Sequence, residues 1–539
     1  MPTRPGTRIW VPTVLTATAL VLTLSASAVA QKQGGTFRFY LRDNPPSASP
    51  HEETTNAVTL PFMALYNNLV LFDPSKKINS LDGIVGDLAT GWSWDASRTK
   101  LTFKLREGVK WHDGNPFTAK DVQCTWHMLS GKTRHDDFRR NPRGIWYQNL
   151  DVVAINGDYE ATFHLKTPQP SLLGLLASGQ SPVYPCHVPL KDMRTKPVGT
   201  GPFKFVEHKR NEGVKIARNP DYWKPGRPYL DAIEMRIIDS RSTRLLAFAA
   251  GEFDMTFDTD VTIPLLKSMA AQAPKAICEL RPINVFTHVI VNSQAPPFDK
   301  AEVRRAMALA LDRNAFNAIL AEGQDVISAT MLPAPDGLWA LPPEELAKLP
   351  GYGGDVEGSR AEGRKLMEGL GYGQSRPLKI KVSTRNIADF RDPAVILIDQ
   401  LKAVHIEGEL ETIDPSVWLA KILKRDYVVG LNLTGASVDD PDVGLVGNYA
   451  CKSDLNVTQY CNPDIDKLLL AQSRETDPAK RRQMVWDIER RLIQDVARPT
   501  ILHRKAATCW HPHVEGLVLQ QNSIYNNWRF EDVWLDKSF

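Results

Sequence analysis

Two arginines, Arg385 and Arg391, have side chains that suit the binding of an acidic group. Arg385 and Asn386 follow a stretch of alternating apolar residues, and Arg391 comes six residues after Arg385. A planar guanidinium binds a carboxylate through two parallel hydrogen bonds. We therefore expect Arg385 to contact a carboxylate of a small ligand, with Arg391 as the alternative contact.

The acidic residues form no convincing catalytic pair. Asp439 and Asp440 are adjacent, and neighbouring side chains on an extended chain point to opposite sides. Pairing Asp439 with Glu411 is the other arrangement for an exported glycoside hydrolase. No G-x-S-x-G nucleophile motif occurs in the sequence. An exported hydrolase is therefore the less favoured alternative.

Glycine-rich and histidine-containing motifs indicate turns rather than catalytic or ligand-binding sites. The segment from Gly199 to Pro202 (GTGP) lacks both the Lys-Ser/Thr of a phosphate-binding loop and the glycine spacing of a dinucleotide site. Gly114 ends Trp-His-Asp-Gly, where a tight turn with positive φ is expected. His511 and His513 are a closely spaced pair, and they are the residues on which a metal or metal-chelate receptor would depend. We predict no metal site and no cofactor.

The elements around Arg385 predict a parallel sheet. Residues 378–383 and 408–413 have strand patterns on either side of a helix over 393–404. Arg385 then lies at the carboxyl end of a strand, where such sheets open a ligand cleft. Trp418, by its position, forms either an aromatic wall of the cleft or part of an inward helix face. Tyr40 ends the first strand and is a candidate by position alone.

Further elements follow from local signals. Residues 61–71 are expected to form a helix, and Asn-Gly-Asp at 156–158 predicts a hairpin turn between two strands. Helix starts are expected at Thr118 with Asp121, at Asp299 with Glu302, and at Asp477 followed by proline. The chain is thus of mixed α/β class, with at least two lobes because one core cannot hold so many residues.

The first thirty residues are expected to be a cleaved secretory signal. Arg4 and Arg8 precede an apolar stretch over 11–24, and the triplet at 28–30 (Ala-Val-Ala) is typical of a cleavage site. The apolar stretch is shorter than the ~20 residues that span a bilayer. No cysteine lies near the cut, which disfavours a lipid anchor. We therefore expect an exported, soluble chain beginning at Gln31.

Charge and cysteine content narrow the function classes. The formal net charge is +3, and removing the two leader arginines leaves about +1, so nothing favours nucleic-acid binding. Six cysteines follow the leader, and an oxidising compartment permits disulfides. Cys451 and Cys461 flank a polar segment and suit a local loop closure. The pairing of Cys124, Cys186, Cys278 and Cys509 stays open.

Three blocks of sequence, taken together, resemble one family. They occupy residues 88–122 (LATGWSWDASRTKLTFKLREGVKWHDGNPFTAKDV), 196–223 (KPVGTGPFKFVEHKRNEGVKIARNPDYW, continued by LLAFAAGEFD at 245–254) and 288–313 (HVIVNSQAPPFDKAEVRRAMALALDR). The chain resembles the extracellular solute-binding proteins of family 5, which include dipeptide, oligopeptide and nickel binders. Weaker matches extend from Gly34 to about Leu502.

The resemblance implies a two-lobed periplasmic binding protein fold of type II, with an extra domain on the first lobe. The first lobe would comprise residues 31–72, 197–283 and 505–539, the extra domain 73–196, and the second lobe 284–504. A ligand would lie between the lobes and favour the closed state.

The resemblance also assigns residues. An arginine of the second lobe would meet a ligand carboxylate, and Arg385 is at that place. Relatives that bind dipeptides have an aspartate before an Asp-Pro-Asp run, where this chain has Ala436 or Ser437. Asp439 would then take over the contact with the amino group, or that group is not recognised; Asp440 either assists or caps the next segment. Cys451 and Cys461 match a disulfide of the dipeptide binders.

The resemblance further implies a function. The chain would be a monomeric periplasmic receptor that captures a small peptide or peptide-like ligand and delivers it to the permease and ATPase of an ABC importer at the inner membrane. An opine, a sugar or a metal chelate is the alternative ligand. A role as a chemoreceptor partner or chaperone stays open.

Overall fold

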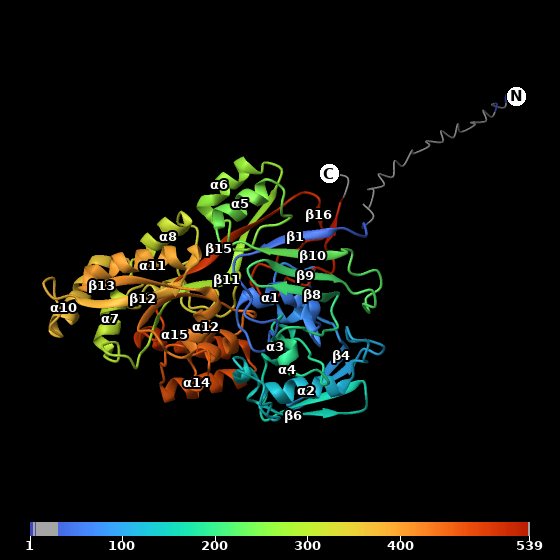
Figure 1. Cartoon of the computed structure of the whole chain (residues 1–539), viewed down its shortest axis with the longest axis horizontal. Coiled ribbons are helices and arrows are strands. Elements are labelled where there is room, and N and C mark those ends of the chain that lie inside the picture. Colours follow the sequence, from blue (N-terminus) through green and yellow to red (C-terminus); the bar gives the residue numbers. More distant parts are fainter. Residues whose placement is uncertain (4–5, 7–30, 537–539) are drawn as a thin grey trace.

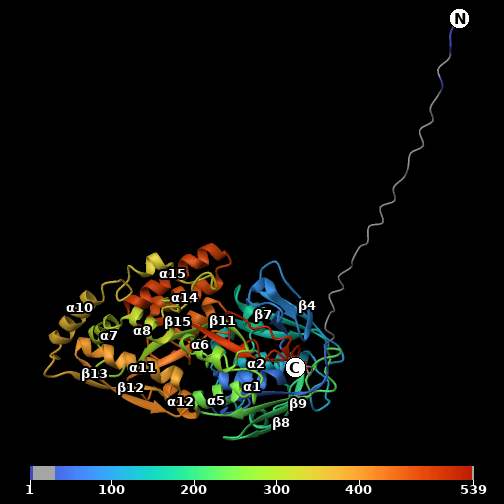
Figure 2. The ribbon, with the colours of Figure 1, turned by 90° about the horizontal axis from the view of Figure 1, so that it is seen from above.

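The computed structural model describes residues 1–3, 6 and 31–536. Most strands of this part of the chain belong to three sheets. The expected signal segment falls almost wholly outside these residues. The sheet that contains Arg385 lies with its helices at one end of the molecule, and the other two sheets lie at the opposite end (Figures 1 and 2). No helix in the described part has the length and apolar character needed to cross a bilayer.

The first sheet has the strand order β1-β10-β9-β8. Its strands are β1 (Thr36–Leu41), β8 (Phe203–Lys209), β9 (Gly213–Arg218) and β10 (Ala232–Ile237). β1 pairs with β10 in parallel, whereas the other pairs are antiparallel. The helices α1 (Asn56–Phe62), α5 (Arg241–Ala249) and α6 (Ile263–Gln272) belong to the same half of the chain.

The second sheet has the order β13-β12-β14-β11-β15. Its strands are β11 (Ile277–Val291), β12 (Leu378–Arg385), β13 (Ile406–Ile413), β14 (Val429–Gly435) and β15 (Thr500–Trp510). β12 is parallel to β13 and to β14, which confirms the predicted parallel α/β unit. β11 is antiparallel to β14 and β15. The long β11 and β15 run from this sheet toward the first one (Figure 1).

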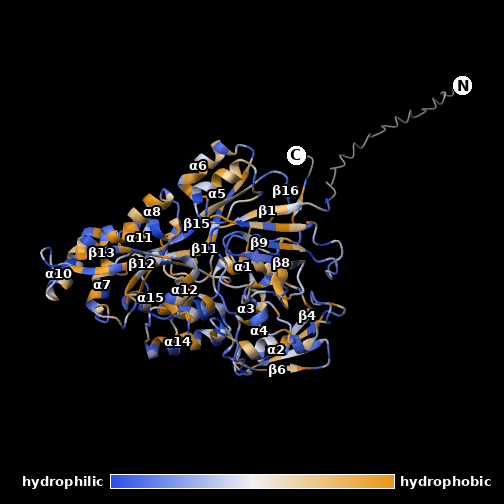
Figure 3. Cartoon of the chain, in the orientation of Figure 1, coloured by the Kyte–Doolittle hydropathy of each residue, from blue (hydrophilic) through white to orange (hydrophobic). Residues whose placement is uncertain are grey.

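Helices cover the second sheet and extend one side of it. They are α7 (Ala301–Leu309), α8 (Arg313–Ala321), α9 (Pro343–Leu346), α10 (Val356–Gly369), α11 (Ala388–Leu401), α12 (Pro415–Leu423), α13 (Gly447–Tyr449), α14 (Pro463–Arg474) and α15 (Pro478–Gln494). Figure 3 shows hydrophobic and hydrophilic residues on the same helices, as expected for helices with one buried face. The core of this part is separate from the larger core around the first sheet.

The third sheet is antiparallel, with the order β4-β5-β7-β6. It comprises β4 (Ala89–Trp94), β5 (Lys100–Leu105), β6 (Leu150–Ile155) and β7 (Glu160–Leu165), and α2 (Ala119–Leu129) packs on it. Short elements complete the fold: β2 (Val70–Phe72), β3 (Ile84–Gly86), β16 (Val514–Glu515), β17 (Trp534–Leu535), α3 (Leu172–Ala177) and α4 (Leu190–Met193). This sheet lies inside the segment 73–196 that was expected to form an extra domain.

Several local predictions are confirmed. Thr118 and Asp121 form a capping box at the start of α2, and β6 pairs with β7 as a hairpin. Asp477 accepts hydrogen bonds from the backbone N–H groups of Ala479 and Lys480 at the start of α15. Gly114 has a φ of 92°, as its turn requires.

Three predicted boundaries are wrong. Residues 61–71 are not one helix, because α1 ends at Phe62 and the chain continues through a turn into β2. The Asn68 side chain there donates to the carbonyl groups of Leu176 and Ser178, which are distant in the chain, so tertiary hydrogen bonds hold this segment outside a helix.

The other two wrong boundaries are the starts of helices. α7 begins at Ala301 without a side-chain cap, since the backbone N–H of Asp299 is bonded to the carbonyl of Ala295 in the preceding turn. α11 begins at Ala388, before the expected Pro393, which lies inside the helix. The earlier start places Asp389 in its first turn, where the side chain bonds to residues of the first lobe.

All six cysteines are paired in the structure. The pairs are Cys124–Cys186, Cys278–Cys509 and Cys451–Cys461. The last is the pair that the sequence indicated. Cys278 and Cys509 face each other on β11 and β15, so this bond joins the two strands that connect the lobes. It was not foreseen, because sequence spacing carries no information on so distant a pair.

Candidate functional site

A cavity lies where the three parts of the molecule meet. Its volume is about 140 Å³, which is the room of about five water molecules and the scale of a small organic ligand. The first lobe contributes Arg42, Thr54, Thr55, Asn56, Thr259, Ile524 and Tyr525. The domain of the third sheet contributes Arg143, Trp146 and Gln180. The second lobe contributes Val285, Arg385, Phe390, Leu419, Ile422, Leu423, Asn432, Leu433, Thr434, Gly435, Val443, Asn448, Leu455, Val457 and Arg498.

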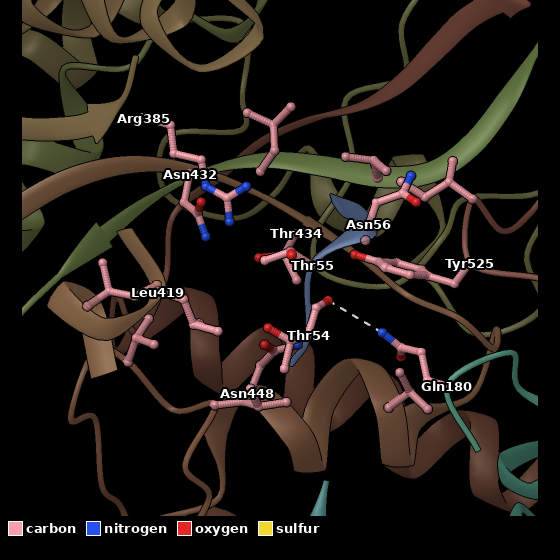
Figure 4. A pocket seen from close by; sticks show the side chains of 18 of the residues that line it. Thr54, Thr55, Asn56, Gln180, Arg385, Leu419, Asn432, Thr434, Asn448 and Tyr525 are labelled. Atoms are coloured by element: carbon pink, nitrogen blue, oxygen red, sulfur yellow. Dashed lines mark hydrogen bonds between the residues drawn. The ribbon is translucent and has the colours of Figure 1, made fainter. Parts of the chain in front are cut away.

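Arg385 lines this cavity at the carboxyl end of β12. The residue is half-buried, and its Nε is enclosed without a hydrogen-bond partner in the structure. Its guanidinium lies 4.8 Å from the centre of the Phe390 ring. Burial lowers the pKa of Arg385 to about 10, opposed by the negative charge of Asp43. Figure 4 shows the side chain directed into the cavity.

The neighbouring strand β14 supplies polar side chains beside Arg385. Val382 pairs with Val429 and Ser383 with Gly430, so the same register continued by two residues brings Arg385 next to Asn432. The Oδ1 of Asn432 is buried and without a partner. Two residues further on, Thr434 also lines the cavity, and its hydroxyl lies 2.8 Å from His288 Nε2.

The opposite wall comes from the segment before α1. Thr54, Thr55 and Asn56 lie across the cavity from Arg385, together with Tyr525 (Figure 4). Gln180 donates to the carbonyl of Thr54 at 3.4 Å. Asn56 is 6% exposed, and neither atom of its side-chain amide has a partner. Polar atoms without a partner in the structure therefore lie on both walls of the cavity.

Two further arginines border the cavity and are buried. Arg143 donates to the carbonyl groups of Pro50 and Glu53, and Arg498 donates to the Asn448 side chain at 2.9 Å. Burial lowers the pKa of Arg143 to about 10 and also lowers the pKa of Arg498. Both are bonded to uncharged groups. The cavity is therefore lined by strong hydrogen-bond donors.

A cluster of ions joins the lobes beside this cavity. Asp389 of α11 is bonded to Arg42 at 2.9 Å and to Thr259 at 2.7 Å, and it also pairs with Arg241. Arg504 lies 3.4 Å away. The surrounding arginines hold the pKa of Asp389 below its usual range despite burial. Arg42, Arg241 and Thr259 come from the part of the chain that holds the first sheet and Asp389 from a helix of the second sheet, so these bonds connect the two parts.

The remaining predicted site residues lie outside the cavity lining. Tyr40 is buried in the first core, where its hydroxyl accepts a hydrogen bond from the backbone N–H of Phe257, and burial raises its pKa. Trp418 is fully buried inside α12, while Leu419 and Ile422 of the same helix reach the cavity. Asn386 is exposed and accepts from Arg391 at 3.4 Å.

The two aspartates have partners within the second lobe. Asp440 is bonded by both Nη atoms of Arg481, at 2.8 and 2.7 Å. Asp439 accepts from the backbone N–H of Leu338, and its carbonyl accepts from the Trp339 side chain. Burial raises the pKa of Asp439 to about 7. Neither residue lines the cavity that holds Arg385.

Sequence reasoning missed Asn56, Arg143, Asn432 and Arg498. A polar Asn432 inside the apolar stretch VVGLNLTG was the one usable signal, since a buried strand position rarely holds an asparagine. The other three lie far apart in the chain. Nothing local distinguishes them from ordinary polar residues.

The histidine pair has structural contacts. His511 bonds to the carbonyl of Phe248 and stacks on its ring, and His513 lies 2.9 Å from Asp254. No group of three metal-ligating side chains occurs among residues 1–3, 6 and 31–536.

Known proteins share this architecture. The periplasmic oligopeptide-binding protein OppA of Haemophilus influenzae is 24% identical over 531 residues, covering 93% of this chain and 95% of that protein. The solved structure of DppA from Helicobacter pylori in complex with the peptide STSA has a TM-score of 0.82 at 21% identity, covering 94% and 99% of the chains. AgaA from A. tumefacien R10, in complex with agropinic acid, has a TM-score of 0.79 at 20% identity, covering 94% and 99%.

These structural likenesses confirm the expected two-lobed fold of periplasmic binding proteins. The family model described as bacterial extracellular solute-binding proteins, family 5 Middle, matches residues 83–456, which is more than half of the chain. The chain therefore belongs to the bacterial extracellular solute-binding proteins of family 5.

Proposed function

We propose that this chain captures a small peptide or peptide-like acid in the cavity between its lobes and delivers it to the permease of an ABC importer. The observation that carries the proposal is the Arg385 guanidinium, which faces the cavity without a carboxylate partner in the described structure. A ligand carboxylate would supply the missing charge and hydrogen bonds. The name of the related OppA supports the peptide class.

The proposal includes where and how the protein acts. Residues 1–30 would direct export to the periplasm, and the exported chain would act as a monomer with no cofactor and no catalytic step. Lobe boundaries at 72, 196, 283 and 504 are part of the proposal. The long strands β11 and β15 cross the last two boundaries, which suits a hinge.

Ligand contacts with both lobes would drive the closure of the cleft. Arg385 and Asn432 of the second lobe lie opposite Asn56 and Tyr525 of the first (Figure 4). A ligand that touches both walls has more contacts in the closed state, so binding shifts the population toward closure. The bonds of Asp389 to Arg42 and Arg241 would form in the same step.

A thermal-shift screen tests the proposal. The purified chain is unfolded and refolded to remove bound solutes, then heated with di- to pentapeptides, opines, sugars and nickel chelates. Ligands that bind the native state raise the unfolding midpoint. We expect shifts with solutes that carry a carboxylate. Shifts confined to sugars or nickel chelates would contradict the peptide-like class, and product formation from any ligand would contradict a pure binding role.

A further inference from the structure

Three arginines of the cavity form no ion pair. Arg143, Arg385 and Arg498 all line it, and in the described part of the chain none has a carboxylate oxygen within ion-pairing distance. Arg143 is 2% exposed and Arg498 5%. The fourth lining arginine, Arg42, is ion-paired with Asp389 at 2.9 Å. Buried cations are normally paired, so three unpaired ones at one cavity require an explanation.

No acidic side chain lines the cavity to balance them. The lining residues include neither aspartate nor glutamate. The negative charge of Asp43 attracts Arg385 without forming an ion pair with it. The carboxylate of Glu53 is paired with Arg140. The cavity therefore has a net positive potential when empty. A free ammonium group entering it would find no carboxylate.

The unsatisfied atoms are mostly donors. The Nε atoms of the three arginines and the Nε1 of Trp146 are buried without partners, and all four can only donate. The remaining unsatisfied atoms of the lining are the Oδ1 of Asn432, which accepts, the amide of Asn56, which offers one donor and one acceptor, and the Thr55 hydroxyl, which can do either. Guanidinium groups can only donate, so a ligand bound by the lining arginines must present acceptor oxygens to them.

We propose that the ligand is a net anionic, peptide-like acid whose amino end is acylated and carries no ammonium group. This rests on the proposed function of the same cavity. One or more carboxylates of the ligand bind the arginines, and the acyl carbonyl accepts a hydrogen bond where a peptide would place its ammonium group. Free peptides are disfavoured, because their ammonium group loses its hydration and meets only positive charge.

Paired dipeptide libraries test the proposal without knowledge of the side-chain preference. One library contains free dipeptides without lysine, and the other is the same library after complete N-acetylation. Each is offered at equal concentration to the refolded chain. Affinity selection with mass spectrometry identifies bound members, and titration calorimetry measures the dissociation constants of matched pairs. We expect the acetylated member of a pair to bind at least tenfold more tightly.

A substitution in the opposite wall provides the complementary test. Asn56→Asp places a carboxylate across the cavity from Arg385 at nearly constant volume (Figure 4). The preference for acetylated members should then fall at least tenfold. Asn156→Asp, in the turn of the third sheet, is the matched control and should leave the preference unchanged.

The outcomes separate this proposal from the broader one. Equal or tighter binding of free dipeptides to the unaltered chain would overturn the acylated class while leaving a peptide receptor intact. Binding to neither library, together with shifts only for sugars or chelates, would overturn both. Since the library comparison uses the unaltered chain, it decides the matter even where Asn56→Asp prevents folding.

Discussion

The second lobe contains two arginine sites that differ in one respect. Arg481 is buried and bonded by both Nη atoms to Asp440, whereas Arg385 faces the interlobe cavity with no carboxylate. In the first lobe the buried Arg244 pairs with Asp260 and the buried Arg281 with Asp258. The difference teaches that a buried arginine in this protein is held either by an internal carboxylate, as these three are, or by backbone carbonyls, as Arg313 is by those of Thr500 and Gly351. Arg385 has neither kind of partner and lies at the cavity, which is what a ligand-binding cation requires.

The largest effect is expected from breaking the matched pair. Arg481→Met leaves the Asp440 carboxylate buried without its partner, which should cost about 3–5 kcal/mol of unfolding free energy. Urea unfolding followed by circular dichroism measures the change. Arg491→Met on the same helix removes an exposed arginine and serves as the control. A loss equal to that of the control would mean that the pair is not structural.

Removing the unmatched arginine should have the opposite signature. Arg385→Ala is expected to weaken a carboxylate ligand by roughly 2–5 kcal/mol, which is at least about 30-fold in dissociation constant. The unfolding free energy should not fall, because no internal ion pair is lost. Calorimetric titration and urea unfolding together give both values. Arg391→Ala, at a partly exposed position six residues away, should change neither value, and unchanged affinity in Arg385→Ala would remove Arg385 from the site.

The comparison of matched and unmatched charges also applies to acidic residues, because one buried carboxylate has no cationic partner. Glu489 is 1% exposed and accepts only backbone N–H groups, from Met331 and Leu341, and burial raises its pKa from 4.5 to about 7. The folded protein thus keeps a proton that the unfolded chain releases. Stability contributed by this group is present below pH 4.5 and is lost as the pH rises through 7.

Glu489→Gln should flatten that pH dependence. Between pH 5 and 8 the unaltered chain should lose roughly 2–3 kcal/mol that the variant does not lose. The variant is less stable at every pH, because its NH₂ group faces a backbone donor, so the slope is the quantity to compare. Urea unfolding at several pH values measures it, with the exposed Glu357→Gln as control. Parallel slopes would argue against a neutral Glu489.

The smallest effect concerns the ions that join the lobes. Asp389→Asn removes the charge that Arg42, Arg241 and Arg504 share. Closure should become less favourable, with about tenfold weaker ligand binding, or about 1.4 kcal/mol. Small-angle X-ray scattering with saturating ligand should show a larger radius of gyration. Asp392→Asn, half-exposed on the same helix, is the control, and equal effects would assign Asp389 to helix stability alone.

Local signals were a good guide to single elements. The caps of α2 and α15 and the β6–β7 hairpin follow from residues within a few positions of one another, so the sequence contains their physical cause. The failures at 61–71 and at Asp299 have a different origin. In the first place the Asn68 side chain bonds to distant carbonyl groups, and in the second a turn hydrogen bond occupies the Asp299 backbone N–H that a capping box would use.

The sequence by itself determined the class of fold, the position of Arg385 at the end of its strand and the closure of the loop between Cys451 and Cys461. Each depends on hydrophobic periodicity, on short spacing or on the family blocks. Only the tertiary structure decided which polar residues share the cavity and which aspartates are already paired. Arg143, Asn56 and Arg498 are distant in the chain, and whether a charge has a partner is set by tertiary packing rather than by its neighbours in sequence.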